Sequence, residues 1–298
     1  MIKALLPLFL LVFLASMWGG SFLFMSISVN ELGPLFLNFL RLIIAASLFL
    51  PVWFFKSFRK SLRQYWRQYV VVGIFNYAVP YTLLSVATLH LSSGTTSLLN
   101  AATPIATALI SWIWLKHQLS HIQWFGLMLA FFGIYLIGSS NMGVQSIWSV
   151  IAAILATFSY AFTINYIKQT INGHNALHLA TGSLFFSAIF MSGISLFIEW
   201  PDHVISQQSW LAVIGLSVVC TSLALIIYFY LINTIGTVSS ASVTFLVPMF
   251  AITWGVIWLK ESFTLNTALN MLLVLVGVGL VLLPDIKKAI KEFKLGAK

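Results

Sequence analysis

Ten stretches of apolar residues follow one another along the chain, and each is about long enough to cross a lipid bilayer as a helix. A membrane-spanning helix needs about 20 apolar residues. The polar segments between the stretches are short and leave no room for a separate soluble domain. The pattern therefore predicts an all-α integral membrane protein with ten transmembrane helices. The predicted spans cover residues 4–26, 34–55, 68–89, 93–115, 121–138, 147–167, 176–198, 209–232, 236–259 and 265–283.

The composition also indicates lipid as the solvent of most side chains. Of the 298 residues, 60% are hydrophobic and only 7% are charged, whereas a soluble domain has about 25% charged residues. The net charge of +9 does not indicate binding to nucleic acid, because the basic residues flank the apolar stretches. The single cysteine, Cys220, excludes an intrachain disulfide and a cysteine-based metal cluster. We expect Cys220 to be a packing residue.

The positions of the basic residues predict the orientation in the membrane, since cytoplasmic loops carry an excess of lysine and arginine. If the N-terminus is cytoplasmic, all but two of the 15 lysines and arginines fall on the cytoplasmic side. The exceptions are Lys260, outside, and Arg41, within the second span. Both termini are therefore predicted to be cytoplasmic. The basic loop 56–67 and the lysine-rich tail are expected to set the topology and to contact anionic lipid.

One sequence pattern occurs twice. The chain reads PIATALISWIWLKHQLS from Pro104 and PMFAITWGVIWLKESFT from Pro248, an offset of 144 residues (248 − 104). Each copy would hold five spans, and because five is odd, the second copy enters the membrane upside down. Such inverted repeats are common in secondary transporters. The predicted units are residues 1–140 and residues 145–285, followed by the basic cytoplasmic tail 286–298.

The two prolines fall inside the fourth and ninth spans and predict interrupted helices. A proline leaves the carbonyl four residues earlier without its helical hydrogen bond, here the carbonyls of Asn100 and Thr244. Interrupted helices at corresponding positions indicate a substrate site, and a kink repacked by neighbouring helices is the alternative. A polar stripe on one helix face favours the site. It comprises Thr96, Asn100, Thr103, Thr107 and Ser111.

Several longer motifs agree with this picture. They are WGGSF from Trp18, NFLRL around Arg41, ATLHLSSGTTSLLNAATP from Ala87 and SSASVTFLVPMFAITWGVIWLKESFT from Ser239. On these motifs the chain resembles the EamA-type members of the drug/metabolite transporter superfamily over nearly its whole length. The resemblance implies a ten-helix bundle, alternating access and movement of small metabolites without ATP. The family signature ends in Leu-x-Glu; the second copy keeps Glu261, whereas the first has His117. We expect Glu261 to cap a helix end or to pair with a lysine.

Polar and aromatic residues inside the spans are the candidate ligands of a substrate. Arg41 is the one formally charged residue well inside a span, and two roles remain open for it, a structural partner or a ligand for a carboxylate or phosphate. Amide and aromatic side chains would bind a zwitterion or an aromatic molecule by hydrogen bonds and stacking. The predicted substrate-binding residues are Trp18, Arg41, Asn76, Tyr77, Tyr81, Asn100, Thr103, Tyr160, Asn165, Tyr228 and Thr244, with Pro104 and Pro248 as helix breaks or hinges.

These features favour a secondary transporter that exports small organic metabolites, such as amino acids, across a bacterial inner membrane. A lipid-linked-sugar flippase or a multidrug exporter of the same superfamily is the first alternative. The sequence leaves the coupling ion and the oligomeric state open. The expected partners are a small-molecule substrate and the lipid bilayer, with no nucleic acid and no cofactor.

A membrane enzyme is the remote alternative. It rests on two histidine pairs with the HxxxH spacing, which on a helix is able to hold a metal ion. The pairs are His117 with His121 and His174 with His178. Because both pairs straddle predicted loops and further histidines are few, we expect no metal site.

Overall fold

The computed structural model describes residues 2–116, 118–139, 144–170, 175–236, 240, 243–262 and 264–296. This part of the chain is helical and contains no β-strand. Seven of its helical segments are long and apolar enough to cross a membrane. Three shorter apolar helices accompany them, at Pro34–Leu48, His121–Leu136 and Val243–Leu259. The predicted all-α fold is confirmed, with the composition of a membrane protein.

The helices follow one another with short connections. Up to residue 139 they are α1 (Ile2–Leu32), α2 (Pro34–Leu48), the 3-10 helix η1 (Leu50–Phe54), α3 (Lys56–Gly73), the π-helix η2 (Ile74–Ala78), α4 (Val79–Ala87), α5 (Ser93–Asn100), α6 (Thr103–Trp114) and α7 (His121–Ser139). From residue 144 they are α8 (Val144–Thr170), α9 (Ala176–Ser195), α10 (Gln207–Ile214), the π-helix η3 (Gly215–Leu223), α11 (Ala224–Ile235), α13 (Val243–Leu259) and α14 (Leu265–Gly296).

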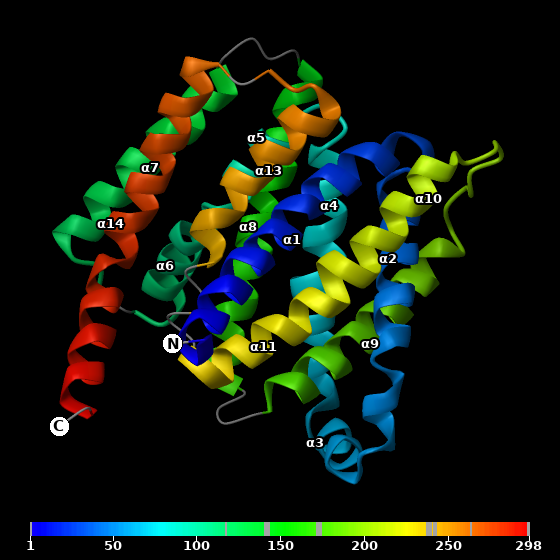
Figure 1. The fold of residues 1–298 in the computed structure, drawn as a ribbon, viewed down its shortest axis with the longest axis horizontal. Coiled ribbons are helices and arrows are strands. Elements are labelled where there is room, and N and C mark those ends of the chain that lie inside the picture. The colour runs from blue at the N-terminus through cyan, green and yellow to red at the C-terminus, as the bar shows by residue number, and fades with distance from the viewer. Residues whose placement is uncertain are drawn as a thin grey trace.

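The helices run up and down between two ends of the molecule, as Figure 1 shows, and α1 begins on the same side as α3 and the end of α14. In the centre, α1 packs against α13 and along α10, η3 and α11, while α8 packs against α4, α5 and α6. At one side α7 and α14 form a close pair. A Cβ atom at Gly126 of α7 would lie 2.7 Å from the carbonyl oxygen of Gly277 of α14, so glycine permits this approach of the two backbones.

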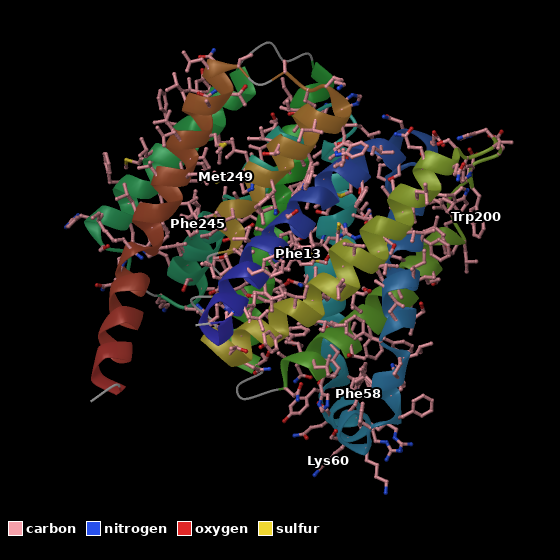
Figure 2. All side chains as sticks on the ribbon, in the orientation of Figure 1. Phe13, Phe58, Lys60, Trp200, Phe245 and Met249 are labelled. Carbon is pink, nitrogen blue, oxygen red and sulfur yellow. The ribbon has the colours of Figure 1, made fainter. Side chains whose placement is uncertain are left out.

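The predicted third span begins earlier than expected. Residues 56–67, expected to form a loop, are the first part of helix α3. Hydrophobic positions explain the difference, because Phe58 is buried in the core while Lys60 is exposed and projects from the end of the molecule (Figure 2). An amphipathic helix of this kind is typical of a membrane interface. The prediction of a loop rested on the charged composition of residues 56–67, and so it missed the helix. The second predicted span is also divided, since α2 ends at Leu48.

Two π-helical segments interrupt otherwise α-helical spans at related places. Shifted by 144 residues, η2 would cover residues 218–222, which lie within η3. A second pair shows the same offset: Lys116, with φ of 52°, and Lys260, with φ of 58°, are the non-glycine residues with positive φ in the described chain. Such a backbone is uncommon for a residue with a Cβ atom, and both lysines end a Trp-Leu-Lys sequence. The two copies of the motif therefore leave their helices by the same local turn.

Candidate functional site

The two prolines affect their helices differently. The fourth predicted span is divided, since α5 ends at Asn100 and α6 begins at Thr103, one residue before Pro104. The hydroxyl of Thr103 donates to the carbonyl oxygen of Asn100 at 2.7 Å, so this carbonyl, predicted to be without a partner, accepts a side-chain hydrogen bond. By contrast, α13 continues through Pro248, and the predicted break is not formed there. Val247, which aligns with Thr103, has no hydroxyl that could hold a freed carbonyl outside the helix.

Four of the predicted site residues come together in the interior. Arg41 of α2 is 3% exposed, and its guanidinium carbon lies 3.5 Å from the centre of the Tyr81 ring of α4. Tyr77 of η2 meets Tyr81 edge-on, with 5.8 Å between ring centres. Tyr160 of α8 lies within electrostatic range of both Arg41 and Tyr81. Asn76 precedes Tyr77 on η2.

Sequence reasoning missed the residue that orients Arg41. The Nε group of Arg41 donates to the hydroxyl oxygen of Thr221 at 3.0 Å, and Thr221 donates in turn to the carbonyl of Leu216, five residues earlier, at 2.8 Å. That five-residue spacing belongs to the π-helix η3. The signal available in the sequence was the group of hydroxyl residues in SVVCTS, inside an apolar span. We refer to Arg41, Tyr77, Tyr81, Tyr160 and Thr221 as the Arg41 cluster.

A second aromatic pair joins α1 to α11. Trp18 of α1 packs against Tyr228 of α11, with 5.2 Å between ring centres. Trp18 and Tyr160 both pack against the core cluster that contains Met25 and Cys220. Cys220 is buried, as expected of a packing residue.

Another predicted residue, Asn165, lies where α8 packs against α6. Asn165 of α8 is fully buried, and its amide nitrogen donates to the carbonyls of Thr107 at 3.2 Å and Ala161 at 2.9 Å. The side-chain oxygens of Asn100 and Asn165 are buried and have no hydrogen-bond partner among the described residues. Thr244 is exposed on α13 and is not among the residues that these contacts bring together.

Two carboxylates cap helices of the other half of the chain. Glu261 follows α13, and its two oxygens accept hydrogen bonds from the backbone N–H of Ser93 at 2.7 Å and from the Ser93 hydroxyl at 2.9 Å. Glu31 of α1 accepts from the backbone N–H of Ser206 at 2.7 Å and from its hydroxyl at 2.8 Å. We call these contacts the two carboxylate caps. They lie at the end opposite to α3 (Figure 1).

The contact of Glu261 tests the expectation that the glutamate of the family signature caps a helix end. Glu261 completes the first turn of α5, where Ser92 already accepts from the N–H of Thr95. Negative charge at a helix N-terminus is favourable because the free N–H groups point at it. The expected helix capping by Glu261 is therefore confirmed. His117, the corresponding residue of the first copy, lies outside the described residues.

The histidine pairs do not form a metal site within the described part of the chain. No group of three or more histidine, cysteine, aspartate or glutamate side chains is placed to hold a metal ion among these residues. His117 and His174 lie outside them. Their partners are on different helices, since His121 begins α7 and His178 lies in α9.

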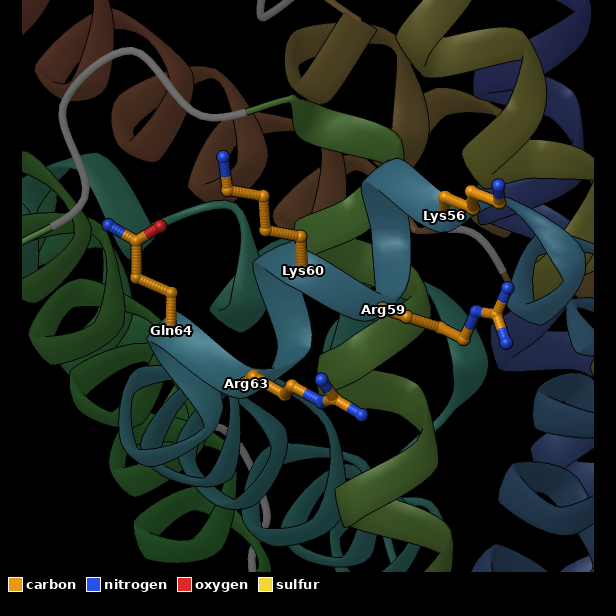
Figure 3. A pocket seen from close by; sticks show the side chains of 5 residues that line it. All are labelled: Lys56, Arg59, Lys60, Arg63 and Gln64. Atoms are coloured by element: carbon orange, nitrogen blue, oxygen red, sulfur yellow. The ribbon is translucent and has the colours of Figure 1, made fainter.

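A pocket with different chemistry lies on α3. It is lined by Lys56, Arg59, Lys60, Arg63 and Gln64, whose side chains fan out from this one helix (Figure 3). None of the predicted substrate-binding residues lines it. Four cations on an amphipathic helix suit the phosphate groups of lipids better than a small solute.

Comparisons with known proteins agree on one family. The sequence profile of the EamA-like transporter family matches residues 5–139 and again residues 147–283. The chain is 27% identical over 280 residues to the uncharacterized transporter YvbV of Bacillus subtilis, covering 91% of this chain and 90% of that protein. It is 23% identical over 283 residues to the protein PagO of Salmonella typhimurium, covering 92% and 91%.

Relatives also occur in archaea, and the fold has been solved. An uncharacterized transporter of Archaeoglobus fulgidus is 26% identical over 272 residues, covering 89% of this chain and 94% of that protein. A crystal structure with 15% sequence identity superimposes with a TM-score of 0.64 over 93% of this chain and 97% of that chain. Because the family profile accounts for nearly all of the apolar helices described above, the chain belongs to the EamA-like transporter family and is a membrane transporter, not an enzyme.

Proposed function

We propose that the protein is a secondary transporter that exports small organic metabolites, with amino acids as the favoured cargo, across the bacterial inner membrane. The observation that carries this proposal is the Arg41 cluster. Helices from both halves of the chain contribute to it: α2, η2 and α4 from the first half, α8 and η3 from the second. Substrate sites of secondary transporters lie at such an interface between repeats, near the middle of the membrane.

The proposal includes two inverted five-helix units, residues 1–140 and 145–285, that alternate access to the site. Three observations support it. The family profile matches twice. The π-helices and the two lysines with positive φ recur at an offset of 144 residues. The packing of α1 against α13 has a counterpart in the packing of α8 against α6.

The distribution of charge supports ten spans with the α3 end in the cytoplasm. The basic residues of α3 and Lys168 in the last turn of α8 lie at that end, whereas Glu31 and Glu261 lie at the opposite end. This arrangement follows the preference for positive charge on the cytoplasmic side. In the proposed orientation the two carboxylate caps lie outside, where each joins one half of the chain to the other.

The caps give the alternating motion a concrete first step. Since each cap holds the outer ends of the two halves together, the site opens outward only when both sets of hydrogen bonds break. Rigid-body rocking of one repeat against the other is the usual motion of transporters built this way. The structure with both caps closed corresponds, in this proposal, to a state shut toward the outside.

The test is solute exchange in liposomes that contain the purified protein. The liposomes are loaded with unlabelled amino acids, sugars, nucleosides or cationic drugs, and uptake of the labelled compound is measured in exchange. We expect exchange with at least one class of amino acid and none in protein-free liposomes. Exchange with no solute, together with movement of a fluorescent lipid between leaflets, would favour the flippase instead.

A further inference from the structure

The charge of Arg41 has no counter-charge among the side chains that the structure describes. Its guanidinium is almost fully buried. Glu31 and Glu261 bind serines at one end of the molecule, and Asp202 lies 3.6 Å from His203. A buried charge is strongly unfavourable unless it is paired and hydrogen-bonded. Among the described side chains, no carboxylate therefore balances the positive charge of Arg41.

The hydrogen-bonding groups of Arg41 are also incompletely used. A guanidinium has five N–H donors. Thr221 accepts from Nε at 3.0 Å, and the one acceptor that the described residues offer to the terminal nitrogens is the sulfur of Met25, 3.8 Å from Nη1. A thioether sulfur is a weak acceptor. Most of the outer donors of the guanidinium therefore remain available for a ligand.

The surroundings of Arg41 fix the plane in which a ligand would bind. The face of the guanidinium is stacked on Tyr81, and its Nε edge is held by Thr221. What remains is the edge with the terminal nitrogens, which matches a carboxylate through two parallel hydrogen bonds. Holding the donors rigidly before binding reduces the ordering cost of recognition.

The amount of charge favours a carboxylate over a phosphate monoester. Arg41 supplies one positive charge, and no second lysine or arginine touches the Arg41 cluster among the described contacts. A phosphate monoester carries about −1.5 to −2 charges at neutral pH, which one guanidinium does not balance. A carboxylate carries one. The tyrosine rings beside Arg41 offer apolar and aromatic surface to the rest of such a molecule.

We propose that Arg41 binds the carboxylate of the transported solute, so that the substrates are small organic carboxylates, amino acids included, and not compounds that lack a carboxylate. This inference rests on the proposed transport function, which it narrows to one chemical class. Tyr81 and Thr221 act as positioning residues that hold the guanidinium for this contact.

The experiment compares carboxylates with their uncharged amides on the purified full-length protein in detergent. For each pair, 3-phenylpropanoate and 3-phenylpropanamide among them, the rise in melting temperature with ligand concentration gives an affinity. We expect wild-type protein to bind the carboxylate at least tenfold more tightly than the amide. Arg41→Gln should abolish that preference, and Arg41→Lys, which keeps the charge but loses the planar fork, should reduce it.

A matched variant separates recognition from a merely structural role. The Ser222 hydroxyl donates to the Ala45 carbonyl at 3.3 Å and so joins η3 to α2, as the Arg41–Thr221 contact does, without touching Arg41. Ser222→Ala should keep the tenfold preference even if its melting temperature falls. The proposal is overturned if Arg41→Gln keeps the wild-type preference. It is also overturned if wild type binds amides or phosphate monoesters as tightly as carboxylates. If Arg41→Gln does not fold, the preference for carboxylates over amides in wild type and in Arg41→Lys still tests the proposal.

The same measurements keep this inference apart from the proposed transport function. Carboxylate binding that depends on Arg41, without exchange in liposomes, would refute transport and leave the recognition site standing. Exchange of solutes without a carboxylate, at the same rate in wild type and in Arg41→Gln, would support transport and refute carboxylate recognition by Arg41.

Discussion

The two proline-containing segments share a sequence pattern but differ in structure. In the first, Pro104 is the second residue of α6, and the chain has already left the helix between Asn100 and Thr103. In the second, α13 runs without interruption from Val243 to Leu259 with Pro248 inside it. A proline removes one donor and crowds one carbonyl in either case. The difference teaches that neighbouring side chains decide whether the helix breaks.

Those neighbours are identifiable in the first segment. α5 is only eight residues long, and isolated helices of that length are not stable in water. Its N-terminus is capped by Ser92 and Glu261, and its C-terminal carbonyl at Asn100 is bonded by Thr103. With both ends satisfied, α5 exists as a separate helix. Val247 offers no comparable bond to α13, so that segment stays continuous.

The largest loss of stability is expected when the cap of α5 is removed. Glu261→Ala removes the acceptor of the Ser93 backbone N–H and leaves the Ser93 hydroxyl with the Ala251 carbonyl at 3.3 Å as its acceptor. Hydrogen bonds to charged groups contribute about 1.5–3 kcal/mol each, so we expect the free energy of unfolding to fall by about 3 kcal/mol. Thermal unfolding in detergent measures it. Glu199→Ala is the control, because Glu199 is exposed, and an equal loss in both variants would contradict the assignment of the cap.

A smaller loss is expected when the cap is displaced rather than removed. A Cβ atom at Gly255 would collide with a carboxylate oxygen of Glu261 and lie 2.5 Å from the Ser93 hydroxyl. Overpacking of this kind costs typically 1–3 kcal/mol, and Gly255→Ala should destabilise by about 2 kcal/mol. Gly279→Ala is the matched control, since nothing lies within 4 Å of its added Cβ. In the double variant with Glu261→Ala, the Gly255→Ala effect should shrink to the cost of the contact with Ser93, and simple additivity would argue against the mechanism.

The two prolines should respond differently to replacement by alanine. Proline inside a helix costs about 3 kcal/mol relative to alanine, so Pro248→Ala should stabilise the protein by about 1–2 kcal/mol after loss of packing at this buried position. Pro104→Ala should change stability by less than about 1 kcal/mol, because the first turn of a helix tolerates proline. Melting temperatures test both. We expect exchange in liposomes to fall in both variants; wild-type rates would count against a role of these prolines in transport.

The smallest effect is expected from making the first segment resemble the second. Thr103→Val removes the hydrogen bond to the Asn100 carbonyl, a contribution of about 1 kcal/mol. Amide hydrogen exchange should become faster in the last turn of α5, which this bond closes. The converse variant, Val247→Thr, supplies the missing hydroxyl, so amide exchange of α13 around Pro248 should become faster. Unchanged exchange in Thr103→Val would show that the break has another cause.

The fold follows largely from the sequence, because the length of an apolar stretch and the side chains at its ends are local properties. The helical start of α3 was missed since its cations mask the buried Phe58. The π-helices were missed because α- and π-helical spans have the same composition. Within the site, Tyr77 and Tyr81 lie four residues apart in the sequence, about one helical turn, and their proximity was predictable. Thr221 lies 180 residues from Arg41, and no local pattern pairs them.

The same limit applies to the capping of α5. The sequence indicates that Glu261 stands at a helix end, and Ser92 followed by Thr95 is a local sign of a helix start. Nothing local tells which helix Glu261 caps, since Ser93 is 168 residues away. Contacts of that separation depend on the packing of α13 beside α5.

The basic first half of α3 has a consequence beyond the placement of the helix. With this end in the cytoplasm, as proposed, its lysines and arginines lie on the negative side of an energised membrane. Moving one of these charges to the other side would cost about 2.3 kcal/mol for each 100 mV of membrane potential. In that orientation, the voltage across the membrane continues to hold the end that carries α3 on the cytoplasmic side after the protein is inserted.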